Sequence, residues 1–596
     1  MPTHYEPIKT VSLESLWVHP GQGENLLYGA RTLLESQKWR RLVLKAINGA
    51  IKIIQQEGAE FLSVMPVAPV TIAASEEGLR IVMMREERFA VALADAYSRA
   101  SNGKKIGVFG IQGGEFPVGT MSFGAVHQAY EDGTPILGLT NSVTPSTSGQ
   151  NRFDLTQEYK GITKWTAYVP KSERIPEFMR RAYTYLRSGR RGPVLLHFAT
   201  SVLGGGLPEY DETKFPYLTV KGWKSPGDQR DVELAVRALL AAKKPVIYVG
   251  QEVFYADACQ ELTEFAELVQ APVVSTLLAK SVFPENHPLS VGVRDIPVDH
   301  YLGGADLVFG IGESLGPGDF KHYFNGAGKT IVHIDVDERD INTRYYANQA
   351  VIGDPKLVLQ QLIAEVRKQA GPEGRRKNED LLKEIEGLKA KKFEKYRKAI
   401  ESNEKPINPY RVYWDMMHTV DMKNSSLSHD AGNTRDQTST IWEAIVPRGF
   451  VGWGNCSSLG FGMAAAAGAK LAYPGRECLH VTGDAGIMYQ IGNFEALVRE
   501  KIGITTVHIN NGGFAGYGPG FWGKGHNPET SVVTPSNVLS TSRAAEALGE
   551  YAERVEEPDE IGPAIKRALN ANRSGKPALL EFICSQHPVY GEWLRG

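Results

Sequence analysis

The residues most suited to chemistry are a carboxylate and an amide, each following an apolar stretch in the last third of the chain. Asp484 lies among the small residues Gly483, Ala485 and Gly486, and Asn511 follows about two dozen residues later. If the two apolar stretches are neighbouring parallel strands, both side chains reach the same sheet edge. Magnesium favours oxygen ligands together with phosphates, and small residues let backbone N–H groups approach a phosphate. The pattern therefore predicts a magnesium diphosphate site.

The pattern also resembles the Gly-Asp-Gly … Asn-Asn motif of thiamine diphosphate enzymes of the acetolactate synthase, pyruvate decarboxylase and oxalyl-CoA decarboxylase type. The resemblance implies that Asp484, Asn511 and the backbone carbonyl of Gly513 bind Mg²⁺. Ala485 departs from the motif's second glycine, and we expect it to be tolerated if its φ is negative. The alternative is a glycine-rich turn in an unrelated doubly wound fold.

A second segment, residues 87–99, resembles the family helix that a glutamate opens. Asp95, Tyr97 and Arg99 fall at the family's offsets when the glutamate is Glu87 rather than Glu86. The resemblance makes Glu87 the catalytic carboxyl that hydrogen-bonds the aminopyrimidine ring and promotes proton removal from the thiazolium. The alternative is a surface glutamate favoured by the helix dipole.

Two further segments resemble cofactor contacts of the same family. Leu459 takes the place of the large apolar side chain that wedges between the two cofactor rings, although an ordinary core leucine would also explain it. Gly432, Asn433 and Thr434 correspond to the segment that supplies polar contacts to the diphosphate. An N-cap or Asx-turn is the competing explanation for these three residues.

The sequence supports the substrate pocket less strongly, because the loops that would form it depart from the relatives. The candidates are Gln112, Glu115, His127 and Gln490. The glycine-rich, aromatic segment 515–522 resembles a mobile cover over an active site, and a plain surface loop is the alternative.

Short apolar stretches alternate with helical patterns along most of the chain, which predicts three consecutive α/β domains with doubly wound parallel sheets. The resemblance names them pyrimidine-binding, central and diphosphate-binding. The glycines after residues 306–309 fail the GxGxxG spacing, and the central domain in relatives holds FAD, ADP or nothing. We expect these segments: an N-terminal arm at 1–42, domains at 43–210, 224–365 and 407–596, and a charged linker helix at 372–406.

Composition excludes several classes of function. The 596 residues include 66 Lys and Arg against 68 Asp and Glu, so the net charge of -2 offers no footprint for nucleic acid or a membrane surface. The 4 cysteines are scattered, which argues against a disulfide framework or zinc site. With neither a signal peptide nor a membrane span in the sequence, we expect a cytoplasmic enzyme.

The preferred hypothesis is an acetolactate synthase-like carboligase of 2-oxo acids that depends on thiamine diphosphate and Mg²⁺. The alternatives are a 2-hydroxyacyl-CoA lyase or oxalyl-CoA decarboxylase acting on an acyl-CoA, and a sulfoacetaldehyde acetyltransferase-like enzyme or simple 2-oxo acid decarboxylase. A non-catalytic cofactor-binding regulator would be expected to lack Glu87, and a nicotinamide dehydrogenase lacks its fingerprint here. Since Glu87 and Asp484 lie on different domains, the resemblance implies a homodimer or homotetramer with active sites shared between subunits.

Overall fold

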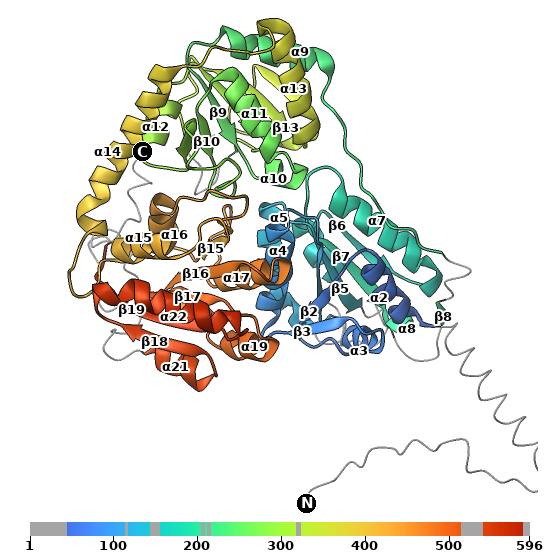
Figure 1. The fold of residues 1–596 in the computed structure, drawn as a ribbon. Helices are drawn as coiled ribbons and strands as arrows, with labels where there is room; N and C mark the ends of the chain where they lie inside the picture. Colours follow the sequence, from blue (N-terminus) through green and yellow to red (C-terminus); the bar gives the residue numbers. More distant parts are fainter. Residues whose placement is uncertain are drawn as a thin grey trace, which may run out of the picture.

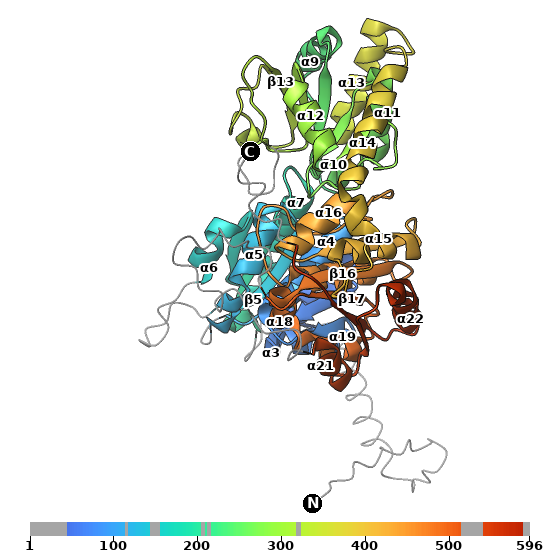
Figure 2. The same cartoon turned by 90° about the vertical axis from the view of Figure 1, so that its left-hand side faces the viewer.

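The computed structural model describes residues 44–113, 117–142, 155–203, 209–210, 216–316, 323–513 and 540–587. They form three parallel sheets wrapped by helices (Figure 1). The first and third sheets lie side by side, and the central sheet lies beyond them at one end of the molecule (Figures 1 and 2). The predicted fold class, three consecutive doubly wound α/β domains, is confirmed. Within the described ranges no helix is long and apolar enough to cross a membrane.

The first sheet has the strand order β3-β2-β4-β5-β7-β6, and all its strands run parallel. Its elements are β2 (Phe61–Val64), β3 (Arg80–Met83), β4 (Gly107–Ile111), β5 (Ile136–Ser142), β6 (Trp165–Val169) and β7 (Val194–Ala199), with helices α2 (Ala46–Gln56), α3 (Ala68–Glu76), α4 (Glu87–Ala100), α5 (Phe123–Glu131) and α7 (Ile175–Arg187). A separate antiparallel pair joins β1 (Leu44–Lys45) to β8 (Glu209–Tyr210).

The central sheet has the order β11-β10-β9-β12-β13-β14 and is also parallel. Its elements are β9 (Pro245–Val249), β10 (Val273–Ser275), β11 (Ser290–Gly292), β12 (Leu307–Ile311), β13 (Thr330–Asp335) and β14 (Gln349–Ile352), with helices α9 (Gln229–Ala241), α10 (Glu252–Ala256), α11 (Cys259–Val269), α12 (Ile296–Gly304) and α13 (Pro355–Ala370). The long helix α14 (Glu379–Ile400) then runs from this sheet toward the third one (Figure 1).

The third sheet has the order β15-β16-β17-β19-β18, again parallel. Its elements are β15 (Ser425–His429), β16 (Glu477–Gly483), β17 (Thr505–Asn510), β18 (Tyr551–Val555) and β19 (Ala578–Ile583), with helices α15 (Pro409–Thr419), α16 (Asn433–Ile441), α17 (Phe461–Ala472), α18 (Asp484–Gln490), α19 (Asn493–Glu500), α21 (Thr541–Ala547) and α22 (Ile561–Arg573).

Helices α4 and α17 join the first and third sheets through a common hydrophobic core. A Cβ added to Gly468 of α17 would lie 2.5 Å from the Cβ of Ala96 on α4, so the helices approach more closely than a larger residue would allow. The buried Arg99 of α4 strengthens this contact, because it pairs with Asp132 at 2.9 Å and donates to the carbonyl of Gly452 at 2.7 Å. The two domains of one chain are therefore held in a fixed relative position.

Candidate active site

The third sheet brings the expected metal ligands to one edge. β16 and β17 are neighbouring parallel strands, and Asp484 and Asn511 directly follow their carboxyl ends. The Asp484 carboxylate is buried, and its Oδ2 accepts hydrogen bonds from the backbone N–H groups of Asn511 at 3.3 Å and Gly513 at 3.2 Å. The strand register and these two hydrogen bonds fix the carboxylate at the sheet edge.

Oxygen atoms converge at this point. The side-chain amide of Asn511 faces both Asp484 and Gly513 with its oxygen; turned over, its nitrogen would donate to Asp484 Oδ2 at 3.0 Å and to the Gly513 carbonyl at 3.2 Å. In the first orientation the three oxygens repel one another unless a cation lies between them, whereas the turned amide satisfies them without one. One carboxylate, one amide and one carbonyl suit Mg²⁺ with phosphate and water. The residues present therefore fit a divalent cation. No group of three or more His, Cys, Asp or Glu side chains in the described ranges offers another metal site.

The buried carboxylate of Asp430 ties together the loops around this edge. It accepts hydrogen bonds from the backbone N–H groups of Ala431 and Gly460, each at 2.8 Å, and from the Thr482 hydroxyl at 3.2 Å. A Cβ on Gly486 would lie 2.4 Å from Asp430 Oδ2, so the start of α18 can approach Asp430 only because residue 486 is glycine.

The predicted diphosphate contacts lie at the same edge. Gly432, with φ 85°, precedes α16, whose first residues are Asn433 and Thr434. The start of α16 lies next to the end of β16, because a Cβ added to Gly483 would be 3.9 Å from the Thr434 methyl. Ala485 lies in the first turn of α18 and has a negative φ, so the departure from glycine is tolerated. Because the first N–H groups of a helix have no partner within it, the starts of α16 and α18 can supply donors to phosphate oxygens.

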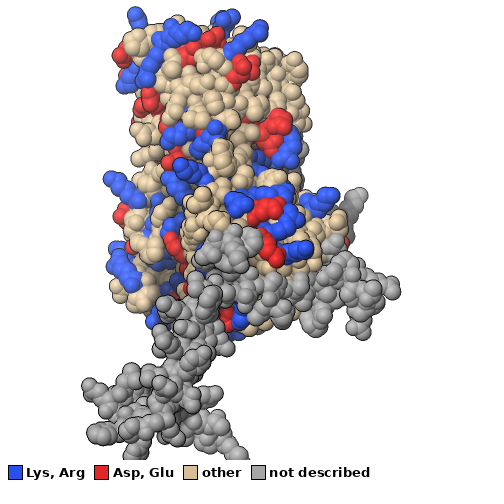
Figure 3. Space-filling view, turned by 90° about the vertical axis from the view of Figure 1, so that its right-hand side faces the viewer, with Lys and Arg blue, Asp and Glu red and all other residues tan. Residues whose placement is uncertain are grey.

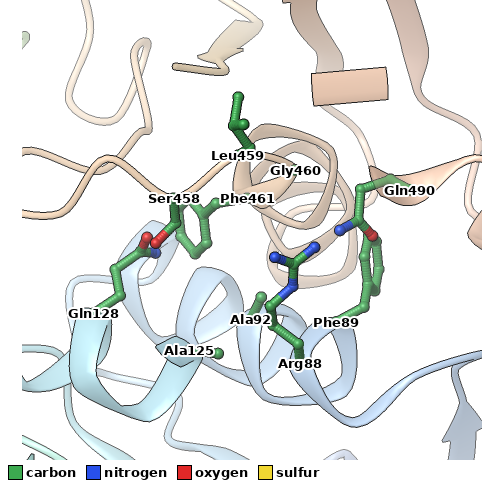
Figure 4. Close-up of a pocket in the computed structure, with 10 residues that line it drawn as sticks. All are labelled: Arg88, Phe89, Ala92, Ala125, Gln128, Ser458, Leu459, Gly460, Phe461 and Gln490. Carbon is green, nitrogen blue, oxygen red and sulfur yellow. The ribbon is translucent and has the colours of Figure 1, made fainter. Parts of the chain in front are cut away.

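Leu459 borders a pocket between the first and third domains. The pocket is lined by Arg88, Phe89, Ala92, Ala125, Gln128, Ser458, Leu459, Gly460, Phe461 and Gln490. Figure 4 shows the Leu459 side chain pointing away from the helices of the first domain. Gln128 is a lining residue that the sequence analysis missed. Its side chain is 1% exposed, and its Oε1 has no hydrogen-bonding partner among the described residues.

The two neighbouring glutamates at the start of α4 have different surroundings. Glu86 accepts a hydrogen bond from Gln490 Nε2 at 3.2 Å, and Gln490 in turn accepts one from Asn493 at 2.9 Å. Glu87 is partly exposed and makes no hydrogen bond or ion pair within the described ranges. Burial raises the pKa of Tyr159 to about 12, the hydrogen bond with Ser122 opposes this rise, and the charge of Glu87 adds a smaller rise. Glu87 is thus the carboxyl free to meet a ligand, and within the described residues of one chain its side chain makes no contact with Asp484.

The remaining substrate candidates are dispersed. Gln490 is committed to the contact with Glu86, and His127 on α5 is 3.4 Å from Glu131 on the exposed side of its helix. The backbone carbonyl of Gln112 accepts a hydrogen bond from the Gly119 N–H at 2.8 Å, which fixes the turn after β4. Glu115 and segment 515–522 lie outside the described residues.

The corresponding edge of the central sheet has different chemistry. The backbone N–H groups of Gly250, Glu252 and Gly312 already donate to carbonyls of the sheet and its loops, at 2.9, 3.3 and 2.8 Å. A Cβ on Gly250 would lie 2.0 Å from the Gly312 carbonyl, so the loops after β9 and β12 touch. Three carboxylates are buried there, those of Glu252, Glu313 and Asp335. Burial and the neighbouring acids raise the pKa of Asp335 well above its usual range. Arg190 and Arg191 offset part of this negative charge at Glu252. The bonded N–H groups and the buried carboxylates disfavour the diphosphate of FAD or ADP at this point.

Comparison with known proteins identifies the class. The family models "Thiamine pyrophosphate enzyme, N-terminal TPP binding domain", "central domain" and "C-terminal TPP binding domain" match residues 50–160, 232–362 and 430–582. The chain belongs to the thiamine pyrophosphate enzyme family, and it is a thiamine diphosphate-dependent enzyme, which confirms the resemblance.

Several relatives align over most of their length. The probable acetolactate synthase large subunit of Methanococcus aeolicus is 28% identical over 90% of this chain and 92% of the relative. Acetolactate synthase isozyme 3 large subunit of Escherichia coli K12 is 25% identical over 87% and 90%. Glyoxylate carboligase of E. coli O157:H7 is 27% identical over 88% and 90%.

Proposed function

We propose that the chain is a carboligase that joins 2-oxo acids and depends on Mg²⁺ and thiamine diphosphate. The observation that carries the proposal is the convergence of Asp484, Asn511 and the Gly513 carbonyl at the carboxyl edge of the third sheet. The names of two relatives, acetolactate synthase and glyoxylate carboligase, both describe enzymes that form such bonds. We therefore favour carboligation over simple decarboxylation and over acyl-CoA cleavage.

Each residue has a distinct role in this proposal. Asp484, Asn511 and Gly513 would hold the cation, and the N–H groups at the starts of α16 and α18 would bind the diphosphate. Leu459 would support the angle between the cofactor rings, and Glu87 would hold a proton at the aminopyrimidine nitrogen. When bound, thiamine diphosphate supplies the electron sink for making a C–C bond next to a carbonyl.

We further infer that a second copy of the chain completes the site. The face around the start of α4 carries exposed apolar side chains on α5, the turn before it and α18: Met121 (69%), Phe123 (39%), Met488 (44%) and Tyr489 (55%). Other residues of α4, α5 and α18 border one pocket, so these exposed side chains lie on elements that are neighbours of the helix that Glu87 begins. A symmetric dimer covering this face would bring Glu87 of one subunit to the diphosphate edge of the other.

Subunit mixing tests this arrangement. The Glu87→Gln and Asp484→Ala chains are each expected to be inactive, and a mixed dimer would hold one site with both residues intact. Recovered activity after demonstrated subunit exchange supports the shared site. Full activity in a strict monomer, or no recovery after exchange, would contradict it.

The substrate assignment needs a panel assay on protein loaded with thiamine diphosphate and Mg²⁺. We expect a ligated product from pyruvate or glyoxylate, detected by mass spectrometry. Turnover of oxalyl-CoA or a 2-hydroxyacyl-CoA alone would favour the acyl-CoA alternatives, and release of aldehyde alone would favour a simple decarboxylase.

Figure 3 shows Lys and Arg interspersed with Asp and Glu on one face, in keeping with the net charge of -2 and with a small-molecule substrate.

A further inference from the structure

We propose that His508 is a positioning residue for Asp484, a role that rests on the proposed function of that carboxylate as a metal ligand. His508 is on β17, fully buried, and its Nε2 lies 3.3 Å from Asp484 Oδ1. Neither of these two atoms forms a hydrogen bond with any described residue. In the proposed arrangement the two buried polar atoms satisfy each other, with the imidazole N–H turned to donate to the carboxylate across the 3.3 Å between them.

The Thr541 hydroxyl is placed to favour the tautomer that this donation requires. The His508 Nδ1 lies 2.7 Å from the hydroxyl oxygen of Thr541, the first residue of α21, and Thr541 is also fully buried. A neutral imidazole has one N–H donor and one acceptor nitrogen. When the Thr541 hydroxyl donates to Nδ1, the proton of the ring is on Nε2, facing Asp484. In the proposed arrangement, donation runs from Thr541 through His508 to Asp484.

The arrangement restrains both oxygens of one carboxylate. Oδ2 accepts the N–H groups of Asn511 and Gly513, while Oδ1 faces His508. A carboxylate held at both ends cannot rotate away from the point where the three oxygens meet, so less order has to be imposed when a cation binds. Outer hydrogen bonds of this kind to metal ligands are typically worth about 10–100-fold in metal affinity.

Binding of Mn²⁺ in the presence of thiamine diphosphate gives a readout that does not depend on turnover, because free Mn²⁺ is counted directly by electron paramagnetic resonance. We expect His508→Leu, which is similar in size but lacks a donor, to weaken Mn²⁺ binding by about 10–100-fold. His508→Gln, which can again place an N–H near Asp484, should recover most of the loss. Thr541→Val should cause a smaller loss, because it removes the hydroxyl that fixes the tautomer.

Thr506→Val is the matched control. Thr506 is on the same strand and is also buried, and its hydroxyl has no partner among the described residues, so its loss should leave Mn²⁺ binding unchanged. Wild-type Mn²⁺ affinity in folded His508→Leu would overturn the proposal. If that variant does not fold, equal effects of Thr541→Val and Thr506→Val would overturn it instead. Asp484→Ala distinguishes failure of the metal site from failure of the positioning role. If Asp484→Ala also retains Mn²⁺, the proposed metal site is wrong. If only the His508 and Thr541 variants retain it, the metal site stands and the positioning role of His508 is wrong.

Discussion

Two sheet edges in this molecule are both formed by the carboxyl ends of parallel strands, yet they have opposite chemistry. At the third sheet, Asp484 follows β16 and lies beside Asn511. Gly486 lets the start of α18 approach Asp430, and the first N–H groups of the helices there can donate to a ligand. At the central sheet, Asp335 also ends a strand, yet the neighbouring N–H groups are already bonded and Glu252 and Glu313 are buried beside it. A doubly wound sheet therefore provides a crevice at its edge, and the residues at the strand ends determine whether that crevice binds a phosphate.

Removing the carboxylate at each edge should produce the largest contrast. Asp484→Ala is expected to abolish retention of thiamine diphosphate with Mg²⁺, because the diphosphate loses its bridging cation. Asp335→Asn, at the end of β13, should retain the cofactor as the wild type does. Mass spectrometry of protein after desalting measures both. Retention by Asp484→Ala would show that the wrong edge has been assigned.

The first domain offers an equally sharp pair in Glu87 and Glu86. Glu87→Gln should still bind the cofactor but slow exchange of its thiazolium C2 proton by about 10²–10⁴-fold, the usual contribution of a general acid–base group. Glu86→Gln should change the exchange much less, since Glu86 is committed to Gln490. Quenched-flow NMR measures the exchange, and the reverse ranking of the two variants would transfer the role to Glu86.

Added cofactors should distinguish the two edges in the wild-type enzyme. Thiamine diphosphate with Mg²⁺, at 100 times its Kd, should stabilise the folded protein by about 2.7 kcal/mol and raise its melting temperature. FAD and ADP should have no effect, because the central edge presents carboxylates where a diphosphate would lie. A flavin in the purified protein, or a thermal shift with ADP, would contradict this account of the central domain.

Two glycines at the third-sheet edge allow a finer comparison. Gly486→Ala would force a methyl to within 2.4 Å of Asp430 Oδ2, whereas Gly483→Ala meets only the Thr434 methyl at 3.9 Å. Displacing packed atoms in this way costs about 1–3 kcal/mol, so Gly486→Ala should weaken thiamine diphosphate binding by about tenfold or more. Gly483→Ala should have a smaller effect. Isothermal titration of both variants checks the ranking.

The sequence analysis predicted the three parallel sheets, because most strands are short apolar stretches between helical patterns. It missed β15, whose sequence Ser-Ser-Leu-Ser-His is polar and yet fully buried. Its serines are tolerated because their hydroxyls donate to backbone carbonyls, Ser426 to Arg448 at 2.9 Å and Ser428 to Gly462 at 2.6 Å. Such partners are distant in sequence and follow only from the folded structure.

Some residues of the candidate site could be assigned from the sequence, and others only from the folded structure. Asp484, Asn511 and Glu87 were assigned from the spacing of residues within local motifs, and their catalytic and binding roles stay predictions. Asp430 begins the segment 430–434 that resembles the diphosphate contacts but was given no role, and His508 carried no motif, because the importance of both comes from contacts across neighbouring strands. Gln490 was considered as a substrate contact, and its hydrogen bond to Glu86, far away in the sequence, could not have been inferred from helix periodicity.

The smallest expected effect concerns the charge buried at the central edge. Burial raises the pKa of Asp335 well above its usual range, so the folded protein binds a proton there that the unfolded chain has lost. Wild-type stability should therefore fall as the pH rises from the ordinary aspartate pKa of about 3.9 through the raised folded value, relative to Asp335→Asn. The amide can still accept the Asp337 N–H, which is 3.1 Å from the carboxylate in the wild type. Melting temperatures at pH 5 and pH 8 should show Asp335→Asn gaining on the wild type at the higher pH. A variant that instead loses stability on raising the pH would mean that Asp335 is a stabilising charge, and that the central edge is closer in character to the third-sheet edge than this comparison holds.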